Sequence, residues 1–513
     1  MNNMKNDDGL LRLHTEDNVV VSKAELAAGT KLLDKGDMIE IADAIPVGHK
    51  VATQAIDKNE PVRKYGQIIG FAKNEITTGQ HVHEHNLAFA EFERNYQFGA
   101  DAKSTDFVPK ADRATFQGIV RADGRVATRN FLAVITSVNC SATVARYICD
   151  HFRGPEMEQW PNVNGVISLT HGAGCGTASH GDGFNYLRRC IAGYAHHPNI
   201  AGCLLLGLGC EINQVDALVS DLGLVPGDNL HAMTIQDMGG TSASVREGIK
   251  CIETMLPTAN SVCRETVPAS HIMLGMECGG SDAFSGVTAN PALGAAADLL
   301  VRHGGTAILG ETPEIYGAEH LLTRRAASDV VGRKLIERIR WWEEYTKKNG
   351  AVVDNNPSPG NKVGGLTTIL EKSLGAAAKG GTTNLVDVYR YGEPVRAKGF
   401  VFMDTPGYDP VSVTGMVAGG ANVVCFTTGR GSVFGCKPTP SLKLATNSDI
   451  YSRMYEDMDI NCGRVVDGEE NIDSLGQEIF DLILRTASGE PSKSESLGFG
   501  DEEFVPWQVG AVL

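Results

Sequence analysis

From residue 116 onward the chain repeats one pattern: a short apolar run, a glycine-rich turn, and then a segment with apolar residues at helical spacing. Apolar runs of about four to eight residues fit buried strands, and longer amphipathic segments fit helices. Strands that alternate with helices predict parallel sheets with crossover helices, an α/β fold. The expected strands are Phe131–Val138, Val163–Leu169, Ile200–Leu208, His271–Met276, Ala307–Leu309, Asn384–Val388, Gly399–Met403 and Asn422–Phe426, and the expected helices are Ser141–Phe152, Gly183–His196, Ser242–Met255, Pro291–His303 and Ser328–Lys348.

The first 90 residues follow a different pattern. Short alternating segments, among them Asn18–Ser22 and Lys50–Ile56, are separated by glycine turns, which predicts a small β-rich module. The segment that follows is polar and has no apolar periodicity, as a linker would be. We therefore expect a β module over residues 1–90, a linker over 91–115, a central α/β domain over 116–265 and a C-terminal α/β domain over 266–513.

Composition narrows the class of protein. The 513 residues are 42% apolar and 21% charged, which is typical of a globular chain with more than one domain. A net charge of −16 argues against nucleic-acid and anionic-membrane partners, although local cations or a metal can still bind a small acid. The sequence has no apolar stretch long enough to span a membrane and no apolar signal core near its start. We expect a cytoplasmic protein whose 12 cysteines are reduced.

Three cysteines are regularly spaced. Cys140, Cys175 and Cys210 lie 35 residues apart, each shortly after an apolar run, and Cys278 follows a fourth run. About 35 residues is the length of a strand–helix unit, so these thiols are expected at the carboxyl ends of strands, where ligands bind in open α/β sheets. Thiolates suit iron, zinc and iron–sulfur clusters.

The residues beside these cysteines distinguish candidate ligands from cysteines that only pack. Glycine beside Cys175, Cys210 and Cys278 leaves room for a bulky ligand, so these three are predicted to share a metal or catalytic role. Cys140 is a further candidate ligand, although the length of a strand–helix unit by itself also explains its position. Free cysteines often only pack in the core, which is the interpretation for Cys149, Cys190, Cys203, Cys251, Cys263 and Cys425.

Histidines form a second group. His81, His83 and His85 alternate, so on an extended strand they point to one face, suited to a metal or to acid–base chemistry. The alternative is a solvated edge strand. His49 is a further candidate, although a lone histidine is more often structural.

Polar loops of the C-terminal half could bind an anion. Asn356–Lys362 and Thr427–Ser432 each combine glycine turns, hydroxyls and one cation, and Arg430 could grip a carboxylate with two hydrogen bonds. Neither loop matches a Walker A phosphate site, and no Rossmann glycine fingerprint follows a strand. Glu311 and Glu314 follow an apolar run and could be metal ligands, acid–base groups or ordinary helix N-terminal acids.

Taken together, these motifs resemble the altronate/galactarate dehydratase family of sugar-acid hydro-lyases. The resemblance covers nearly the whole chain and rests on Lys64–Gly66, His81–Asn86, Arg121–Arg125, Thr128–Asn130, Gly207–Glu211, Glu277–Asp282, Asn290–Pro291, Asn356–Lys362 and Thr428–Gly431. It implies an antifreeze-like β-clip module joined to a Rossmann-like catalytic part, iron-dependent dehydration of a sugar acid, and a homodimer. The His81, His83 and His85 run resembles the altronate branch, which implies D-altronate going to 2-keto-3-deoxy-D-gluconate, with galactarate as the alternative. A related sulfolactate-cleaving branch normally has separate subunits, and fusion in one chain argues against it.

On this resemblance we expect Cys175, Cys210 and Cys278 to hold iron, as Fe²⁺ or an iron–sulfur cluster, with Mn²⁺ as another possible ion. The histidines would transfer protons. The expected substrate-binding residues are Arg430, Lys362, Arg129, Ser281 and Asp282. The alternative from a different class is a non-catalytic sugar-acid sensor, which would need neither the thiols nor the histidines.

Overall fold

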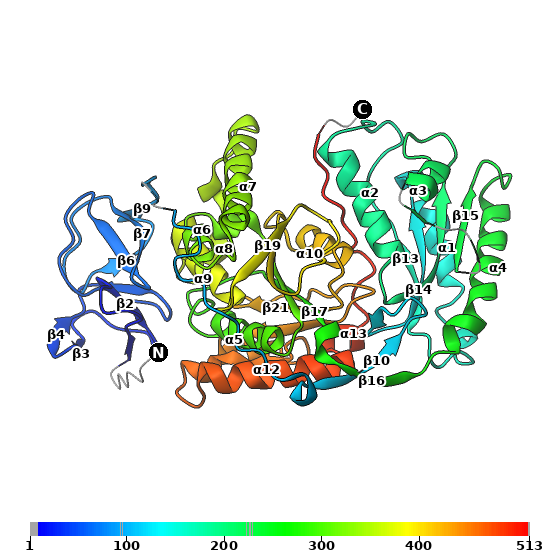
Figure 1. Cartoon of the computed structure of the whole chain (residues 1–513). Coiled ribbons are helices and arrows are strands. Elements are labelled where there is room, and N and C mark those ends of the chain that lie inside the picture. The colour runs from blue at the N-terminus through cyan, green and yellow to red at the C-terminus, as the bar shows by residue number, and fades with distance from the viewer. Residues whose placement is uncertain are drawn as a thin grey trace.

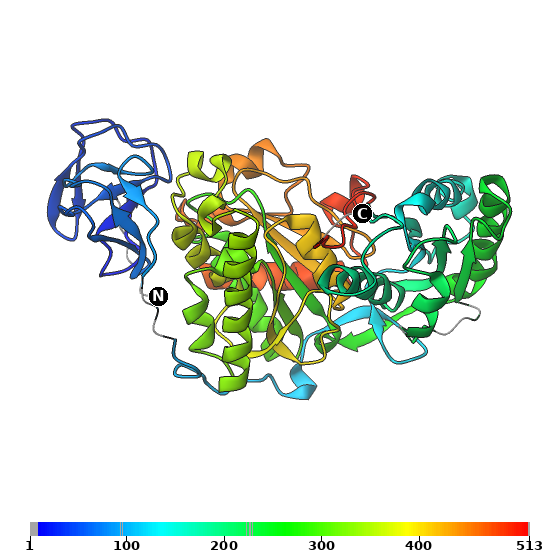
Figure 2. The same cartoon turned by 90° about the horizontal axis from the view of Figure 1, so that it is seen from above.

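The computed structural model describes residues 9–510 except 93, 95, 222, 225, 226 and 228. Three parts lie in a row: a small β module, a large α/β domain in the middle, and a second α/β domain at the far end (Figures 1 and 2). The middle part is the C-terminal domain, so the chain runs from the module past it to the far domain and then returns. The order in space therefore differs from the order in sequence.

The N-terminal module consists of short antiparallel strands around two small apolar clusters. One sheet has the order β1-β2-β5-β8, another β6-β7-β9, and β3 pairs with β4. The strands are β1 Leu10–Leu11, β2 Val19–Ser22, β3 Lys31–Asp34, β4 Asp37–Glu40, β5 Lys50–Ala52, β6 Pro61–Lys64, β7 Gln67–Ala72, β8 His81–Val82 and β9 Leu87–Ala88.

The far domain has a parallel sheet with the order β13-β12-β14-β15. Helices α1 and α4 cover the face formed by Val134 and Leu204, and α2 covers the face formed by Ala133 and Leu205. The elements are β12 Phe131–Thr136, α1 Ala142–Asp150, β13 Gly165–Leu169, α2 Asp182–Ala195, β14 Ile200–Gly207, α3 Val215–Asp221, β15 Leu230–Thr234 and α4 Thr241–Asn260.

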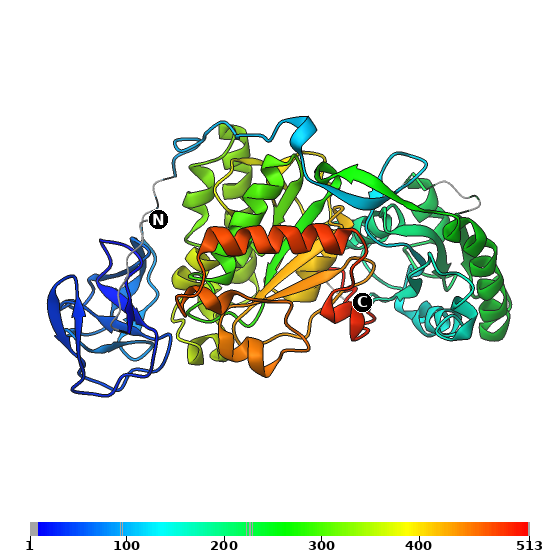
Figure 3. The same cartoon turned by 90° about the horizontal axis from the view of Figure 1, so that it is seen from below.

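The C-terminal domain has a seven-stranded parallel sheet with the order β19-β20-β18-β17-β21-β22-β23. Helices α5 and α12 cover one face, where α12 crosses the strands in Figure 3, and α10 packs on the other. The strands are β17 Met273–Cys278, β18 Thr306–Leu309, β19 Leu385–Tyr389, β20 Gly399–Met403, β21 Val423–Thr428, β22 Ser441–Ala445 and β23 Ile460–Asn461. The helices are α5 Ala289–Arg302, α6 Glu319–Thr323, α7 Asp329–Lys348, α8 Pro359–Val363, α9 Ile369–Ala377, α10 Asp409–Ala418, α11 Ser448–Arg453, α12 Ile472–Ala487 and α13 Lys493–Ser496.

The two α/β domains are joined by a small antiparallel sheet and by helix packing. Strands β11 Val126–Ala127, β10 Thr115–Val120 and β16 Arg264–Pro268 form the sheet. Helix α2 approaches α10 so closely that a methyl group on Gly193 would lie 2.3 Å from the Ala418 carbonyl oxygen. The described 3₁₀ turns are η1 Lys110–Asp112, η2 Asn139–Ser141, η3 Pro155–Met157, η4 Ala269–His271, η5 Thr312–Ile315, η6 Val353–Asn355, η7 Ala378–Gly380 and η8 Cys462–Val465.

The expected strands and helices from residue 116 onward are confirmed, with end points that differ by a few residues. The mixed α/β class with parallel sheets is also confirmed, whereas the antifreeze-like and Rossmann-like assignments stay predictions. Two packing predictions are wrong: Cys263 is exposed and Cys251 is half-buried, because the first follows the end of α4 and the second lies near its outer face. Within the described residues, no helix is both long and apolar enough to cross a membrane.

Candidate functional site

An imidazole cluster lies where the module meets the C-terminal domain. Pairing of β5 with β8 places His81 opposite Val51 and so beside His49. His49 Nδ1 lies 2.9 Å from His81 Nε2, and one ring nitrogen from each of His49, His81 and His83 falls within 4.8 Å of the others. His85 is exposed, with its ring centre 5.4 Å from that of His81.

Burial keeps the cluster uncharged. Burial, together with the neighbouring imidazoles, lowers the pKa of His81 to about 3, and burial with Lys50 and His49 lowers that of His83 to about 4. The buried His83 Nδ1 has no hydrogen-bond partner among the residues that the structure describes. Neutral imidazoles with a free ring nitrogen are good ligands for divalent iron, manganese or zinc. These residues therefore fit a metal ion.

A buried ion triad docks the module. Lys50 Nζ lies 2.9 Å and Lys64 Nζ 2.9 Å from the carboxylate of Glu371 in α9, and all three side chains are at most 1% exposed. Lys50 also donates to the Gly365 carbonyl at 2.7 Å. Burial alone would raise the pKa of Glu371, but the two ammonium groups hold it well below its usual range. Since Lys50 follows His49, the triad also holds the imidazole cluster against the C-terminal domain.

A polar pocket of about 260 Å³ lies at the carboxyl end of β17. The chain leaves β17 toward β18 on one side and returns to β21 on the other, so this is the topological switch point of the sheet, where α/β proteins bind ligands. The lining residues are Cys278, Gly279, Gly280, Glu314, Asn355, Asn356, Ser358, Asn361, Lys372, Gly407 and Asp409.

Charges beneath the pocket are paired. Cys278 Sγ lies 3.4 Å from carboxylate oxygens of both Glu311 and Glu314, and the three form a second group of ligand atoms within 4.8 Å. However, Lys379 pairs with Glu311, and Lys372 pairs with Glu314 at 2.7 Å. Burial raises the pKa of the Cys278 thiol well above its usual value. With its carboxylates neutralised and its thiol protonated, this group suits a divalent ion less well than the imidazoles do.

One acid in the pocket is poised near neutral pH. Burial, reinforced by the carboxylates of Glu311 and Glu314, raises the pKa of Asp409 to about 7. Asp409 is the first residue of α10 and lines the pocket. A carboxyl group with this pKa can donate and accept a proton under physiological conditions.

Helix α8 links the imidazole cluster to the pocket. At its end the Val363 carbonyl lies 3.3 Å from His49 Nε2, while Asn361 lines the pocket and donates to the Ser281 carbonyl at 2.8 Å. A five-residue helix is about 7.5 Å long, so the two features belong to one site.

Two cations border this site. The Arg430 amide donates to the Gly280 carbonyl at 2.7 Å, and the Arg430 side chain packs on Gly364, where an added methyl group would lie 3.3 Å from its Cδ. Arg430 is exposed, and within the described residues its guanidinium makes no ion pair. Lys362 is paired with Glu84 of the module at 2.9 Å. Arg430 is thus the more available carboxylate ligand.

Three predicted substrate contacts have structural roles instead. Arg129 is 2% exposed, and its guanidinium pairs with Glu495 at 2.6 Å and donates to the carbonyls of Thr128, Thr486 and Glu490, so the prediction that it binds substrate is wrong. The Asp282 carboxylate accepts hydrogen bonds from Ser285, Thr446 and Asn447 and so organises the loops behind the pocket. Ser281 is buried and contributes its carbonyl to Asn361.

The structure does not bring the three predicted thiol ligands together. Cys278 ends a strand of the C-terminal sheet and is buried, whereas Cys175 and Cys210 follow β13 and β14 of the far domain and are exposed. In the described parts of the chain, neither belongs to a group of three ligand atoms within 4.8 Å. The shared centre predicted for these three is therefore wrong, because a strand-end position does not specify to which sheet the strand belongs. Glu311 does lie beside Cys278, as a paired carboxylate.

Several residues of the site were missed by sequence reasoning. They are Lys50, Lys64, Glu371, Lys372, Lys379 and Asp409. A usable signal existed for two: Glu371 and Lys372 interrupt the otherwise apolar segment Ile369–Ala377. Charged residues inside an apolar helix are rarely buried unless paired.

Three family models match successive parts of the chain. An altronate/galactarate dehydratase SAF domain matches residues 8–90, a D-galactarate dehydratase/altronate hydrolase second domain matches 118–260, and a D-galactarate/altronate dehydratase C-terminal domain matches 269–512.

Curated relatives match over nearly the full length. Galactarate dehydratase (L-threo-forming) of Escherichia coli is 38% identical over 94% of this chain and 93% of its own. Altronate dehydratase of Bacillus subtilis is 33% identical over 98% of this chain and 99% of its own. Altronate dehydratase of Escherichia coli is 34% identical over 98% of this chain and 99% of its own.

Proposed function

The chain belongs to the D-galactarate/altronate dehydratase family, and from this premise we propose that it dehydrates D-altronate to 2-keto-3-deoxy-D-gluconate. It is a hydro-lyase, like its relatives. The observation that supports a sugar-acid substrate best is the polar pocket of about 260 Å³ at the switch point of the large sheet. An imidazole cluster borders this pocket through α8, and the Arg430 guanidinium, which makes no ion pair in the described part of the chain, borders it at Gly364.

The choice of an aldonic acid rests on charge. D-altronate has one carboxylate, whereas galactarate has one at each end. In the described site, Lys362, Lys372 and Lys379 already pair with acids, and Arg430 is left to bind a carboxylate. Galactarate remains the second candidate, because a relative of that name is 38% identical.

We propose that His49, His81 and His83 hold Fe²⁺ or Mn²⁺. The support is the close approach of their ring nitrogens, their neutral state and the buried, unpartnered His83 Nδ1. When bound, such an ion would stabilise the negative charge that develops as a proton leaves the carbon beside the carboxylate.

The residues of the chain would then handle the protons. Arg430 binds the substrate carboxylate with two hydrogen bonds. His85, which lies outside the three-histidine group, takes the proton from C2, and the C3–O bond breaks. Asp409, half-protonated near pH 7, gives the leaving hydroxyl its proton, so that water departs and the enol relaxes to the 2-keto acid.

Turnover of a substrate panel tests the proposal. Anaerobically purified protein with Fe²⁺ is incubated separately with D-altronate and galactarate, and the 2-keto acid formed is measured. Faster turnover of altronate supports the assignment, faster turnover of galactarate reverses the order of the two substrates, and binding without turnover of either supports the sensor alternative. Size-exclusion chromatography with light scattering tests the homodimer, which like the cytoplasmic location stays a prediction.

A metal-site variant provides the matched test. His83→Ala should lose bound metal and turnover, whereas His151→Ala, at the surface of the far domain, should keep both. Full turnover by a folded His83→Ala protein would remove the imidazole cluster from the mechanism.

A further inference from the structure

Exposed cysteines are concentrated at one place in the far domain. Seven of the 12 cysteines are buried and one is half-buried, so exposure is the exception in this chain. Of the four exposed ones, Cys140, Cys175 and Cys210 each follow the carboxyl end of a strand, and Cys263 lies elsewhere. Cysteine is among the residue types most often buried, so three exposed thiols after three strands require an explanation other than packing.

These three strands are neighbours in the sheet. The order β13-β12-β14 places β12 in the middle, so the loop that bears Cys140 lies between those that bear Cys175 and Cys210. The chain leaves β12 toward β13 and then crosses back to β14 on the other side. The loops thus meet at the topological switch point of this sheet, the second such point in the chain.

Hydrogen bonds tie the three loops together. The Asn139 amide donates to the Ala173 carbonyl at 2.9 Å, and the Asn139 side chain donates to the His171 carbonyl at 2.9 Å. The Ile212 amide donates to the carbonyl of Cys175 itself at 3.0 Å. Each of the three cysteines is therefore at most two residues along the chain from a residue that makes a hydrogen bond to a neighbouring loop.

Buried polar groups reinforce this framework from below. The carboxylate of Glu211 is 2% exposed, and it accepts hydrogen bonds from the Ser137 hydroxyl at 2.5 Å and from the amide of Gly209 at 2.7 Å. Asn213 donates to the Ser137 carbonyl at 3.2 Å, and its buried Oδ1 has no hydrogen-bond partner in the described chain. A methyl group on Gly207 would lie 2.6 Å from a Glu211 oxygen, so glycine is needed there.

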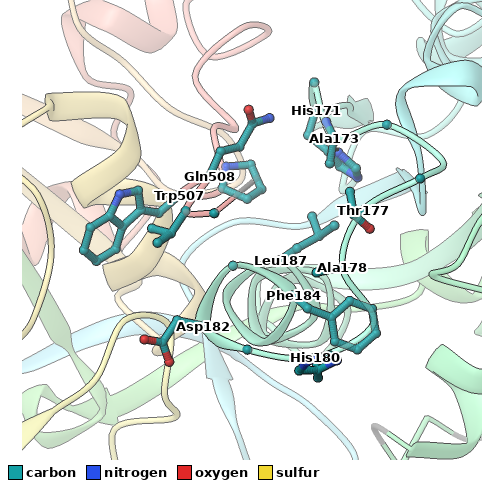
Figure 4. A pocket seen from close by; sticks show the side chains of 18 residues that line it. His171, Ala173, Thr177, Ala178, His180, Asp182, Phe184, Leu187, Trp507 and Gln508 are labelled. Carbon is teal, nitrogen blue, oxygen red and sulfur yellow. Dashed lines mark hydrogen bonds between the residues drawn. The ribbon is translucent and has the colours of Figure 1, made fainter. Parts of the chain in front are cut away.

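A cavity opens beside the central thiol loop. Residues on both sides of Cys175, namely Gly174 and Gly176, line a pocket of about 280 Å³. Figure 4 shows His171, Ala173 and Thr177 on one wall, Trp507 and Gln508 of the C-terminal tail on another, and Leu187 of α2 between them. A small molecule can therefore reach the loop that bears Cys175.

We propose that Cys140, Cys175 and Cys210 ligate an iron–sulfur cluster at this edge of the far domain. A single tetrahedral ion has metal–sulfur bonds of about 2.3 Å and holds its sulfur ligands about 4 Å apart. In the described chain these three sulfurs do not form a group within 4.8 Å, although their loops are bonded together. A polynuclear cluster holds its cysteine ligands farther apart than one ion does, and the loops joined by the Asn139–Ala173 and Ile212–Cys175 hydrogen bonds would each supply one ligand.

The cluster would have one iron without a protein thiolate. Four cysteines usually bind such a cluster, and here three are present. His171 is not a free fourth ligand, because its Nε2 lies 3.0 Å from the Thr136 carbonyl and its Nδ1 accepts the Ala173 amide at 3.2 Å. That iron would be free to take a small oxygen-containing ligand. This inference goes beyond the proposed function and does not depend on which sugar acid is the substrate.

Iron and sulfide content test the site. The full-length protein is reconstituted anaerobically with ferrous iron and sulfide, and iron, acid-labile sulfide, visible absorption and the EPR spectrum after reduction are measured. The wild type should bind about four iron and about four sulfide per chain if the cluster is [4Fe–4S]. Cys140→Ser, Cys175→Ser and Cys210→Ser should each lose the sulfide and the absorption band.

Two controls separate this site from the rest of the chain. Cys263→Ser changes an exposed thiol away from the edge and should keep the cluster. His83→Ala should also keep it, since the imidazole cluster lies on the module, so loss of the metal ion there is distinguishable from loss of the cluster. Circular dichroism confirms that each variant is folded.

The proposal is overturned if wild-type protein binds iron without sulfide, or if folded Cys140→Ser and Cys210→Ser retain both. A Cys140→Ser protein that keeps the cluster while Cys278→Ser loses it would return the site to the C-terminal domain. Binding of one zinc ion in place of iron and sulfide would also overturn it.

Discussion

Replacing Glu371 with glutamine should undock the N-terminal module. The Glu371 carboxylate lies about 3 Å from two ammonium groups, and none of the three side chains is more than 1% exposed. At an effective dielectric constant of about 20, each such contact is worth about 6 kcal/mol of attraction before the cost of desolvation. Removing the shared partner of a buried ion pair typically costs about 3–5 kcal/mol, because an uncompensated charge stays buried.

This loss falls on the docking of the module. The apolar part of the interface is small: Ala318, Leu374 and Ala377 pack against the module core. A cost of about 3–5 kcal/mol shifts the docking equilibrium by roughly a hundredfold to several thousandfold. Because the pKa of Glu371 is lowered, its contribution is complete above the ordinary glutamate pKa and is lost as the solution becomes strongly acidic.

Limited proteolysis at neutral pH measures the effect. Cleavage in the polar segment 96–109, which has no described helix or strand, should accelerate in Glu371→Gln, and turnover should fall with docking. Glu40→Gln is the matched control, since Glu40 pairs with Lys31 at 3.5 Å with both side chains more than 60% exposed. Such exposed pairs contribute at most about 1 kcal/mol. If Glu371→Gln is cleaved at the wild-type rate, the triad does not hold the module.

Three further predictions concern single side chains. In the wild type, kcat/KM should fall as pH rises through about 7, because Asp409 loses the proton that it donates. Asp409→Asn should abolish this fall. An unchanged pH profile would exclude Asp409 as the acid. Arg430→Met should raise KM for altronate about 10-fold to 150-fold, which corresponds to the loss of a hydrogen bond to a charged group. Tm should change little, because the Arg430 side chain is exposed. An unchanged KM would contradict its role in binding substrate. Arg129→Met should lower the free energy of unfolding by about 3 kcal/mol, since it breaks a largely buried ion pair with Glu495. KM should stay constant. A raised KM at unchanged Tm would restore Arg129 as a substrate ligand.

The imidazole cluster shows how far local pattern reaches. Alternation of His81, His83 and His85 predicts one extended strand that carries all three imidazoles on one face. Strand β8 ends at Val82, however, and residues 84–86 form a turn, so the rings approach one another through that turn and not through strand periodicity. The alternation also does not indicate that His49 joins them, since that requires β5 to pair with β8. The register of two strands 30 residues apart depends on the packing of the whole module.

Buried charges were the least predictable feature. Nothing in a local pattern tells whether Lys50 faces water or a carboxylate more than 300 residues away. The same is true of Asp409, whose pKa is raised by burial and by acids on another segment. Such shifts are properties of the assembled site.

The sequence by itself determined that this chain alternates strands and helices and that Cys140, Cys175, Cys210 and Cys278 follow strands, because periodicity and turn residues act over a few positions. Only the tertiary structure decided that the first three share one sheet edge while Cys278 lies beside Glu311 on another sheet. Strand order is set by which apolar faces pack together, and that choice is made between segments far apart in the chain.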